Sequence, residues 1–295
     1  MPTQEKSRET KARLGLIASM TIFGTIGIFR RLIPLPSSFL AMTRGFVGAL
    51  FLLLMMLLLH KKPDRAAIRG NLPLLLISGG CIGINWILLF EAYNYTSVAT
   101  ATLCYYFAPT FTILLAPVFL RDRLTRKKLL CVLLALLGMV FVSGFWEHGI
   151  GSAGELRGIL LGLGAALLYA AVVLMNKRIG PMNAFDKTTV QMFSAAVVLL
   201  PYTLLTGAMN GLSFSPLTLL MLAIVCIVHT GTAYALYFAS FAHLPAQTLA
   251  LFSYIDPVIA VLLSALLLRE PMTVYTVIGA VLILGAAVWS ELPET

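Results

Sequence analysis

The sequence predicts an all-α polytopic membrane protein, with ten transmembrane helices arranged as two inverted five-helix repeats. Three observations lead to this prediction. Of the 295 residues, 59% are apolar and 11% are charged, whereas about 25% of the residues in soluble domains are charged. Apolar runs long enough to cross a bilayer recur along the chain, and the two halves of the sequence resemble each other. The scarcity of charge also argues against a disordered chain and a nucleic-acid-binding domain.

Ten apolar segments can be placed in order, since a bilayer core requires about 20 residues per helix. They cover residues 14–32, 38–59, 72–92, 97–119, 128–146, 158–176, 186–206, 217–239, 246–268 and 273–290. No small-residue cleavage pattern follows the first segment, so we interpret it as a retained span. The chain then divides into tails at 1–13 and 291–295, a first repeat at 14–146, an extracytoplasmic linker at 147–157 and a second repeat at 158–290.

Lysine and arginine residues are distributed unevenly over the predicted loops. With a cytoplasmic N-terminus, sixteen of them lie on the cytoplasmic side and four lie outside, while Arg44 falls within a span. Cytoplasmic loops are enriched in these residues. The sequence therefore predicts a protein of the inner (plasma) membrane with both termini in the cytoplasm.

The internal repeat is visible when the sequence is shifted by 148 residues. Residues 81–125 then align with 229–273 without a gap, with twelve identities in 45 positions. The informative matches involve residues other than leucine, and they include Gly83/Gly231, Tyr106/Tyr254, Pro109/Pro257 and Arg121/Arg269. An odd number of spans per repeat turns the second repeat upside down. Inverted repeats are typical of secondary transporters.

Two segments carry a family resemblance. The runs YYFAPTFTILLAPVFLRDRLT (105–125) and SYIDPVIAVLLSALLLREPMT (253–273) are each followed by an apolar helix that contains glycine or alanine. With these runs the chain resembles the EamA-type family of the drug/metabolite transporter (DMT) superfamily over nearly its whole length. The resemblance implies ten helices that move small metabolites by alternating access, with helices 1, 3, 4, 6, 8 and 9 around a central cavity. It also implies a homodimer through helices 5 and 10.

The first helix departs from the family pattern. Phe23 stands where a tryptophan is common, and the membrane glutamate of the small multidrug members is absent. The dimeric mechanism of those members is therefore not transferred to this chain.

Asp256 lies in the middle of the ninth predicted span and directly precedes Pro257. A carboxylate at this depth costs about 2.5–3.5 kcal/mol on insertion scales. We interpret Asp256 as a proton-coupling group or a counter-ion for a cationic substrate; the alternative is a structural acid that fixes the helix break. Pro109 and Pro257 predict breaks in the fourth and ninth helices beside the cavity, because proline cannot donate a helical hydrogen bond.

Two further ionisable side chains fall inside predicted spans. His229 could relay protons with Asp256 or bind a substrate carboxylate, although a lone histidine in an apolar helix is commonly a structural donor. Arg44 could hold an anionic substrate, extend toward the interface or pair with Glu91. We favour the structural pair of Arg44 with Glu91.

The remaining candidates for the cavity wall are polar or aromatic. Together with Asp256 and His229, the predicted set comprises Asn85, Trp86, Tyr106, Tyr169, Asn176, Tyr234 and Tyr254. Tyr234 belongs to a helical stripe with Tyr237, Phe238 and Phe241. Such rings can enclose a planar or quaternary ammonium substrate, and helix packing is the alternative.

The sequence contains no Walker motif, nucleotide-binding loop, Ser/His/Asp order or CxxC pair. We therefore expect no cofactor, no metal site and no enzymatic activity, with an ion gradient, for which protons are one candidate, or the substrate's own gradient as the energy source. The favoured function is secondary active export of amino acids or related small metabolites. The alternatives are import of cationic or quaternary amines, a membrane-embedded lipid enzyme that uses Asp256 and His229, and a non-transporting scaffold or channel.

Overall fold

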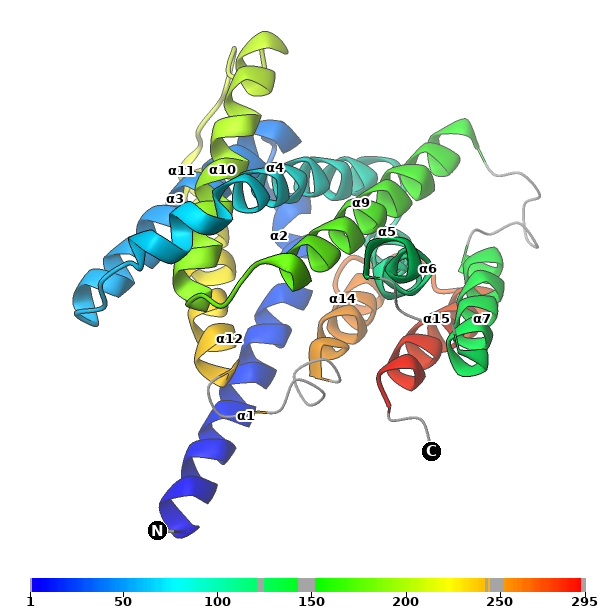
Figure 1. Cartoon of the computed structure of the whole chain (residues 1–295). Helices are drawn as coiled ribbons and strands as arrows, with labels where there is room; N and C mark the ends of the chain where they lie inside the picture. The colour runs from blue at the N-terminus through cyan, green and yellow to red at the C-terminus, as the bar shows by residue number, and fades with distance from the viewer. Residues whose placement is uncertain (1, 121–124, 143–151, 242–243, 245–251, 293–295) are drawn as a thin grey trace.

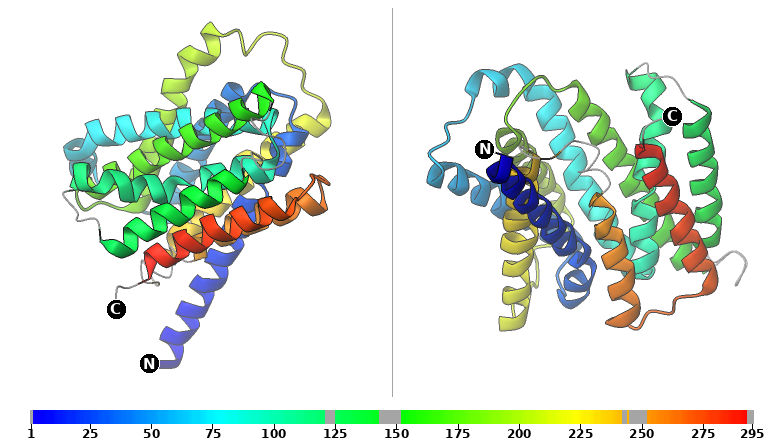
Figure 2. Two further views of the ribbon diagram at one scale, coloured as in Figure 1. Left: turned by 90° about the vertical axis from the view of Figure 1, so that its right-hand side faces the viewer. Right: turned by 90° about the horizontal axis from the view of Figure 1, so that it is seen from below.

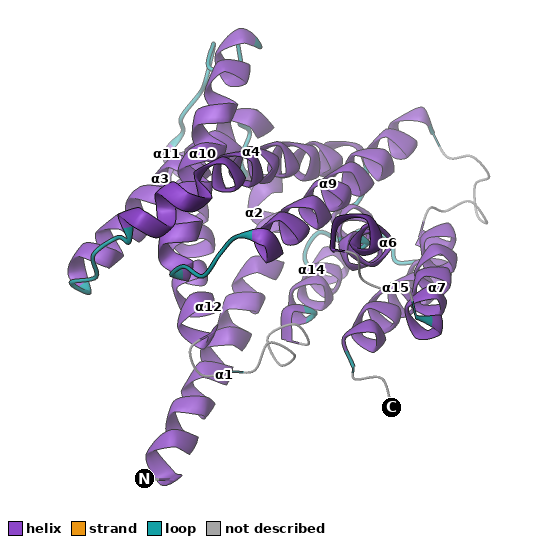
Figure 3. Cartoon of the chain, viewed as in Figure 1, coloured by secondary structure: helices purple, strands orange, loops and turns teal. Residues whose placement is uncertain are grey.

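The computed structural model describes residues 2–120, 125–142, 152–241, 244 and 252–292, and these residues form helices and loops without a strand (Figures 1 and 3). In chain order the helices are α1 (Pro2–Gly24), α2 (Ile26–Leu32), α3 (Ser37–Leu58), α4 (Arg65–Tyr95), α5 (Val98–Tyr105), α6 (Ala108–Leu120), α7 (Arg126–Val142), α9 (Ala153–Arg178), α10 (Ala184–Leu205), α11 (Pro216–Ile224), the π-helix η1 (Val225–Thr232), α12 (Ala233–Phe241), α14 (Ile255–Leu266) and α15 (Val274–Glu291).

Seven helical segments of the described chain are long and apolar enough to cross a membrane. They are Arg8–Leu32, Ser37–Leu58, Arg65–Tyr95, Val98–Phe119, Ala153–Arg178, Phe185–Leu205 and Pro216–Tyr237. Ile255–Leu266 and Val274–Ser290 are apolar but shorter. The fold is thus that of an all-helical, multi-pass membrane protein, and its arrangement as ten helices in inverted repeats stays a prediction.

Side-chain caps fix where several helices begin. Oxygens of Asp64, Ser97, Ser152 and Thr273 accept hydrogen bonds from N–H groups in the first turns of α4, α5, α9 and α15. Those N–H groups have no partner within their own helices, so the caps stabilise the helix starts. As a result, α4 and α9 extend beyond the spans predicted at 72–92 and 158–176.

Several predicted segments take a different form in the structure. Residues 2–13, predicted as part of a tail, belong to α1. The predicted span 97–119 is interrupted between α5 and α6, where Pro109 is the second residue of α6 and has no N–H to donate to Tyr105. The predicted span 217–239 combines α11, η1 and α12. Parts of the predicted span 246–268 and of the linker 147–157 lie outside the described residues.

Helix α10 packs against both α3 and α4, and α4 and α9 run side by side (Figures 1 and 2). Their shared core contains the fully buried Leu40, Leu52, Phe90 and Tyr93. Gly79 lets α4 approach α10, because a Cβ at this position would lie 2.4 Å from the carbonyl oxygen of Gln191. Small residues permit the same close packing between many membrane helices.

Helices α7 and α15 form a pair at one edge of the molecule (Figure 1). A Cβ on Gly138 would lie 2.9 Å from the carbonyl oxygen of Gly279, and a Cβ on Gly279 would lie 2.6 Å from that of Gly138. The pair leaves apolar side chains such as Leu133 and Val281 exposed on its outer surface. A homodimer through these two helices stays a prediction.

Contacts between helix ends define two ends of the bundle. At one, which we call the Glu270 end, Arg31 and Glu270 form an ion pair, and Glu270 also accepts a hydrogen bond from the Val98 N–H. At the other, the Asp186 end, the Asp64 N–H donates to Asp186, and Lys127 Nζ donates to the Leu292 carbonyl oxygen. Segments that are far apart in the sequence thus meet at each end, as expected for a chain that crosses the bundle back and forth.

Candidate functional site

Four helix interruptions meet in pairs inside the bundle. Thr25 lies between α1 and α2, and its Oγ1 is 2.8 Å from Nε2 of His229 in η1. Tyr106, between α5 and α6, donates a 2.5 Å hydrogen bond from Oη to Oδ2 of Asp256, two residues after the turn at Tyr254. Irregular backbone at membrane depth occurs where it is buried in protein or lines a cavity, and π-helical turns are frequent at functional sites. These interruptions therefore mark the candidate site.

The Tyr106–Asp256 bond connects the two halves of the chain. Tyr106 directly follows α5 and Asp256 is the second residue of α14, followed by Pro257 in the first turn, where proline is tolerated. Gly24 lets α1 reach this point, because a Cβ there would lie 2.6 Å from the Asp256 carbonyl oxygen. The Asp256 side chain is half-buried and forms no ion pair within the described chain. The structure thus holds this acid with a neutral hydroxyl donor.

His229 is held by α1 and by its own helix. Beyond the Thr25 contact, its Nδ1 lies 3.5 Å from the Ile224 carbonyl oxygen, and its ring packs edge-on against Phe29 with centroids 4.7 Å apart. Neither hydrogen bond involves Asp256. The predicted proton relay between His229 and Asp256 therefore stays a prediction.

Arg44 is bound differently from the sequence-based interpretation. Its Nε donates a 2.8 Å hydrogen bond to Thr230 Oγ1, and its guanidinium lies 4.5 Å from the ring centroid of Trp86. Glu91 instead accepts a 3.2 Å hydrogen bond from Asn94. The predicted Arg44–Glu91 pair is wrong because Trp86 and Phe90 share the face of α4 that Arg44 covers, whereas Glu91 lies about 100° further around the helix.

Two glycines bring α3 and η1 close enough for the Arg44–Thr230 contact. A Cβ on Gly48 would lie 2.4 Å from Thr230 Cγ2, and a Cβ on Gly231 would lie 2.6 Å from the Phe51 ring. Any larger side chain at either position would separate the two helices. The local sequence thus sets the position of Arg44.

Tyrosines gather beside Asp256. Tyr105 contacts Tyr106 with ring centroids 5.7 Å apart and Tyr169 with centroids 5.5 Å apart, and Tyr234 packs on Phe23 at 5.0 Å. Tyr169 is 42% exposed. We call Arg44, Tyr105, Tyr106, Tyr169, Tyr234 and Asp256 the central site.

Other predicted wall residues make contacts between helices. Asn85 Nδ2 donates to the Ala165 carbonyl oxygen of α9 at 2.5 Å, and Asn176 Oδ1 accepts from Gln191 of α10 at 2.8 Å. Trp86 and Tyr254 are buried. The side chains of Phe238 and Phe241 lie outside the described residues. Roles in a cavity wall for these residues stay predictions.

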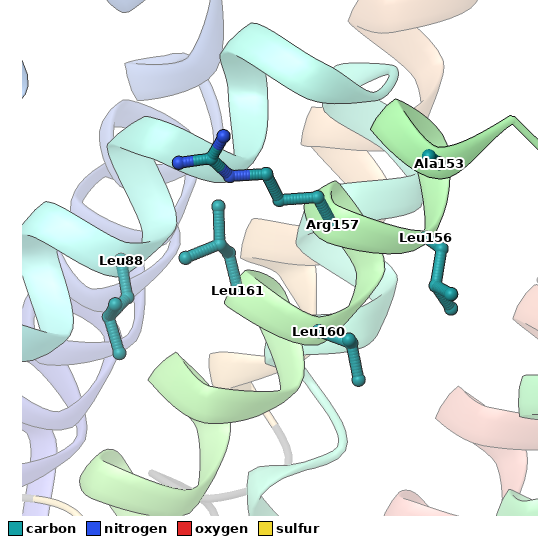
Figure 4. Close-up of a pocket in the computed structure, with 6 residues that line it drawn as sticks. All are labelled: Leu88, Ala153, Leu156, Arg157, Leu160 and Leu161. Atoms are coloured by element: carbon teal, nitrogen blue, oxygen red, sulfur yellow. The ribbon is translucent and has the colours of Figure 1, made fainter.

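A separate groove of about 300 Å³ lies between α4 and α9. Its wall consists of Leu88, Ala153, Leu156, Arg157, Leu160 and Leu161, and Figure 4 shows Arg157 extending from α9 past Leu161 toward α4. The groove lacks an acid or a tyrosine and shares no residue with the central site. Among the residues that the structure describes, no cluster of three histidine, cysteine or acidic side chains could hold a metal ion.

Comparison with known proteins decides the family. The model of the EamA-like transporter family matches the chain twice, over residues 10–144 and 156–291. The chain belongs to the EamA-like transporter family. It is accordingly a multi-pass membrane protein of a transporter family, and the two matches coincide with the two halves that the sequence repeat predicts.

Similar proteins agree with this assignment. "Uncharacterized transporter YxxF" of Bacillus subtilis (strain 168) is 28% identical over 284 residues, which cover 96% of this chain and 90% of that relative. "Protein RarD" of Escherichia coli (strain K12) is 26% identical over 191 residues, which cover 65% of this chain and 62% of that relative. A crystal structure with 16% identity covers 95% of this chain and 96% of its own with a TM-score of 0.66, which supports the fold alone.

The sequence reasoning missed two polar partners in and around the central site. Thr25 and Thr230 hold His229 and Arg44, yet each is a common residue in an apolar run. No sequence pattern indicated that Gly48 and Gly231, which set the distance between α3 and η1, lie on facing helices. The alignment of Gly231 with Gly83 in the internal repeat was the one available signal.

Proposed function

We propose that the protein is a secondary active transporter that exports amino acids or related small metabolites by alternating access through a central cavity. The hydrogen bond between Tyr106 and Asp256 carries this proposal, because it joins the two halves of the chain where α5 ends and α14 begins. Secondary transporters bind substrates and coupling ions at such discontinuous helices near the repeat interface. Family membership favours this function over the membrane-embedded lipid enzyme.

Asp256 is the proposed proton-coupling group. A half-buried carboxyl group that is bound by one hydroxyl and no cation can exchange a proton when helix movement breaks that bond. Tyr106 would hold the acid in one conformation and release it in the other. His229, held by Thr25, would follow the movement of α1.

Import of a cationic or quaternary amine is the second candidate function. The tyrosine rings around Asp256 form the kind of surroundings that bind such cations. Arg44, however, lies close enough to Tyr105, Tyr234 and Asp256 to interact with them electrostatically. Its positive charge would repel a simple cation, so a substrate that also carries a negative charge fits the site better.

A transport assay with purified protein tests the proposal. Proteoliposomes containing the full chain should show counterflow of at least one of the twenty proteinogenic amino acids, supplied in radiolabelled form, above the level in protein-free vesicles. Arg157→Gln, in the separate groove, is the matched control and should leave this flux unchanged. Counterflow of quaternary amines without any amino acid flux would support the second candidate, and no flux of either class would contradict a transport function.

The orientation of the chain has its own test. The sixteen-to-four distribution of lysine and arginine supports cytoplasmic termini in the inner membrane. A reporter enzyme that is active only outside the cytoplasm should therefore give no signal when fused after Thr295, and a signal when inserted near Asn210 in the loop between α10 and α11. Strong activity of the Thr295 fusion would reverse the assignment and place the Glu270 end in the cytoplasm.

A further inference from the structure

Arg44 is a buried cation with unused hydrogen-bond donors. Only 6% of the residue is exposed, yet the one hydrogen bond of its guanidinium is that from Nε to Thr230. Its two Nη atoms donate to no group in the part of the chain that the structure describes, and neither is sealed from solvent. A guanidinium carries five N–H donors. Four of them consequently remain available to something that is not protein.

Arg30 shows how the same fold binds a structural arginine. It is buried to a similar degree, with 7% exposed, but its Nη1 donates to the Ile33 carbonyl oxygen at 3.0 Å. Its Nη2 donates to Ser37 at 2.9 Å and to Asn94 at 3.4 Å. Both Nη groups of Arg30 are thus occupied by protein acceptors, and its Nε is buried without a partner in the described chain. The contrast indicates that the open end of Arg44 is not a consequence of burial alone.

The surroundings of Arg44 orient that open end. Thr230 holds Nε, the Trp86 ring covers one face of the guanidinium, and Phe90 lies 5.8 Å away. These contacts leave the Nη edge as the free side of the group. Tyr105, Tyr234 and Asp256 are near enough to interact with the charge, which places Arg44 at the same central site as the acid.

We propose that Arg44 binds the carboxylate of the transported substrate. This inference rests on the proposed transport function and adds the residue that binds the carboxylate of a zwitterionic substrate such as an amino acid. The planar edge of a guanidinium matches the two oxygens of a carboxylate and forms two parallel hydrogen bonds with it. The substrate ammonium then lies toward Asp256, and its side chain contacts the tyrosine rings. Arg44 and Asp256 thereby select a molecule with both charges over one with either alone.

Chemical modification of the wild-type protein tests the open edge directly. Full-length protein in nanodiscs is treated with butanedione, an arginine-selective reagent, and the modified peptides are quantified by mass spectrometry. We expect Arg44 to react and at least one of the twenty L-amino acids to protect it, whereas its decarboxylated amine does not. Arg30 is the matched control and should react slowly with or without amino acid. An unreactive Arg44, or an Arg44 that no amino acid protects, would overturn the proposal.

Binding measurements on variants separate recognition from folding. Arg44→Gln should weaken binding of the protecting amino acid at least about tenfold, as expected when one partner of a buried charge pair is removed. The variant should bind the C-terminal amide of the same amino acid as tightly as wild type does. Arg44→Lys retains the charge and should recover part of the affinity, which a misfolded protein would not. Equal acid-over-amide preference in wild type and Arg44→Gln would overturn the proposal. Should phosphoserine protect Arg44 only through its phosphate, the carboxylate assignment would fall as well.

These results also distinguish the two proposals. Protection of Arg44 without flux in proteoliposomes would retain the carboxylate site and contradict transport. Flux of an amine that lacks a carboxylate, without any protection of Arg44, would retain transport and contradict the carboxylate site.

Discussion

The Glu270 end and the central site both contain an arginine and an acid, and they treat them in opposite ways. At the Glu270 end, Arg31 Nη2 lies 3.0 Å from Glu270, and the acid also accepts hydrogen bonds from Val98 N–H and Ser264. In the central site, Arg44 binds Thr230 and Asp256 accepts from Tyr106, without a bond between the two charges.

This difference suggests different roles for the two regions, closing one end of the bundle and binding the substrate. Ion pairing near the surface adds little stability, about 0–1 kcal/mol, so the Arg31–Glu270 pair can form and separate as the ends of α2, α5 and α14 move. Unpaired charges inside a membrane protein are costly and are retained where a ligand or an ion supplies the missing partner. Under the proposed transport function, closure would therefore occur at the Glu270 end, and substrate and proton would bind at the centre.

The largest expected effect follows from removing the central acid. Asp256→Asn keeps the size of the side chain and its hydrogen bond with Tyr106 but cannot bind or release a proton. We expect this variant to lose pH-driven accumulation of amino acids in proteoliposomes while it retains exchange of the same order as wild type. Accumulation is measured by imposing a pH gradient across the vesicle membrane and following uptake of labelled substrate that is added outside.

Tyr106→Phe is the matched control for the acid. It removes the hydroxyl donor but leaves the carboxyl group, so accumulation should still be driven by the pH gradient, at a reduced rate because the acid is no longer held in one conformation. Undiminished pH-driven accumulation by a folded Asp256→Asn would reduce Asp256 to a structural acid at the helix break. Loss of accumulation in Tyr106→Phe but not in Asp256→Asn would likewise contradict the comparison.

An intermediate effect is expected at the contact between α3 and η1. Gly48→Ala places a methyl group within 2.4 Å of Thr230 Cγ2, and overpacking of this kind costs about 1–3 kcal/mol. Because the displaced helix carries Thr230, the variant should also bind amino acids more weakly. Thermal unfolding and binding in detergent measure the two effects.

Gly70→Ala offers the matched control, since a Cβ on Gly70 in α4 would meet nothing within 4 Å. Alanine is favoured over glycine in a helix by up to about 1 kcal/mol, so this variant should be as stable as wild type or more stable. A Gly48→Ala protein with wild-type stability and binding would show that Arg44 does not depend on the close approach of α3 and η1.

The smallest effect is expected from the loss of Arg31 at the Glu270 end. Arg31→Gln removes a partly exposed ion pair and should lower the free energy of unfolding by less than about 1 kcal/mol. Glu270→Ala also removes the acceptor of the Val98 N–H and should cost about 1–3 kcal/mol. A double-mutant cycle in denaturant measures the coupling. A coupling well above about 1 kcal/mol would contradict an end that opens readily.

The sequence predicted helix positions well because bilayer thickness and apolar length determine them. The span predicted at 38–59 corresponds to α3 at Ser37–Leu58, and that at 273–290 to α15 at Val274–Glu291. It did not predict the π-helical turn η1 or the interruption at Thr25, because both lie in apolar runs whose composition suits a regular helix. Interactions between distant helices decide such local backbone choices.

The sequence singled out residues of the central site but did not predict which way they face. Asp256, Tyr106 and Tyr169 stood out as polar groups inside spans, and the structure brings them to one cluster. Arg44 was paired with Glu91, whereas rotation about α4 directs Trp86 toward Arg44 instead. Helical facing depends on how α3 and α4 pack, and that packing rests on glycine contacts with η1 and α10.

Cross-linking the Glu270 end tests whether this end opens and closes around the central site. Cysteines replace Arg31 and Glu270 in a background where Cys81, Cys104, Cys131 and Cys226 are changed to alanine, and counterflow of an amino acid is measured before oxidation, after oxidation and after reduction. We expect oxidation to stop counterflow and reduction to restore it, because the pair must separate in each transport cycle. Counterflow at the uncrosslinked rate in a fully cross-linked protein would contradict the account.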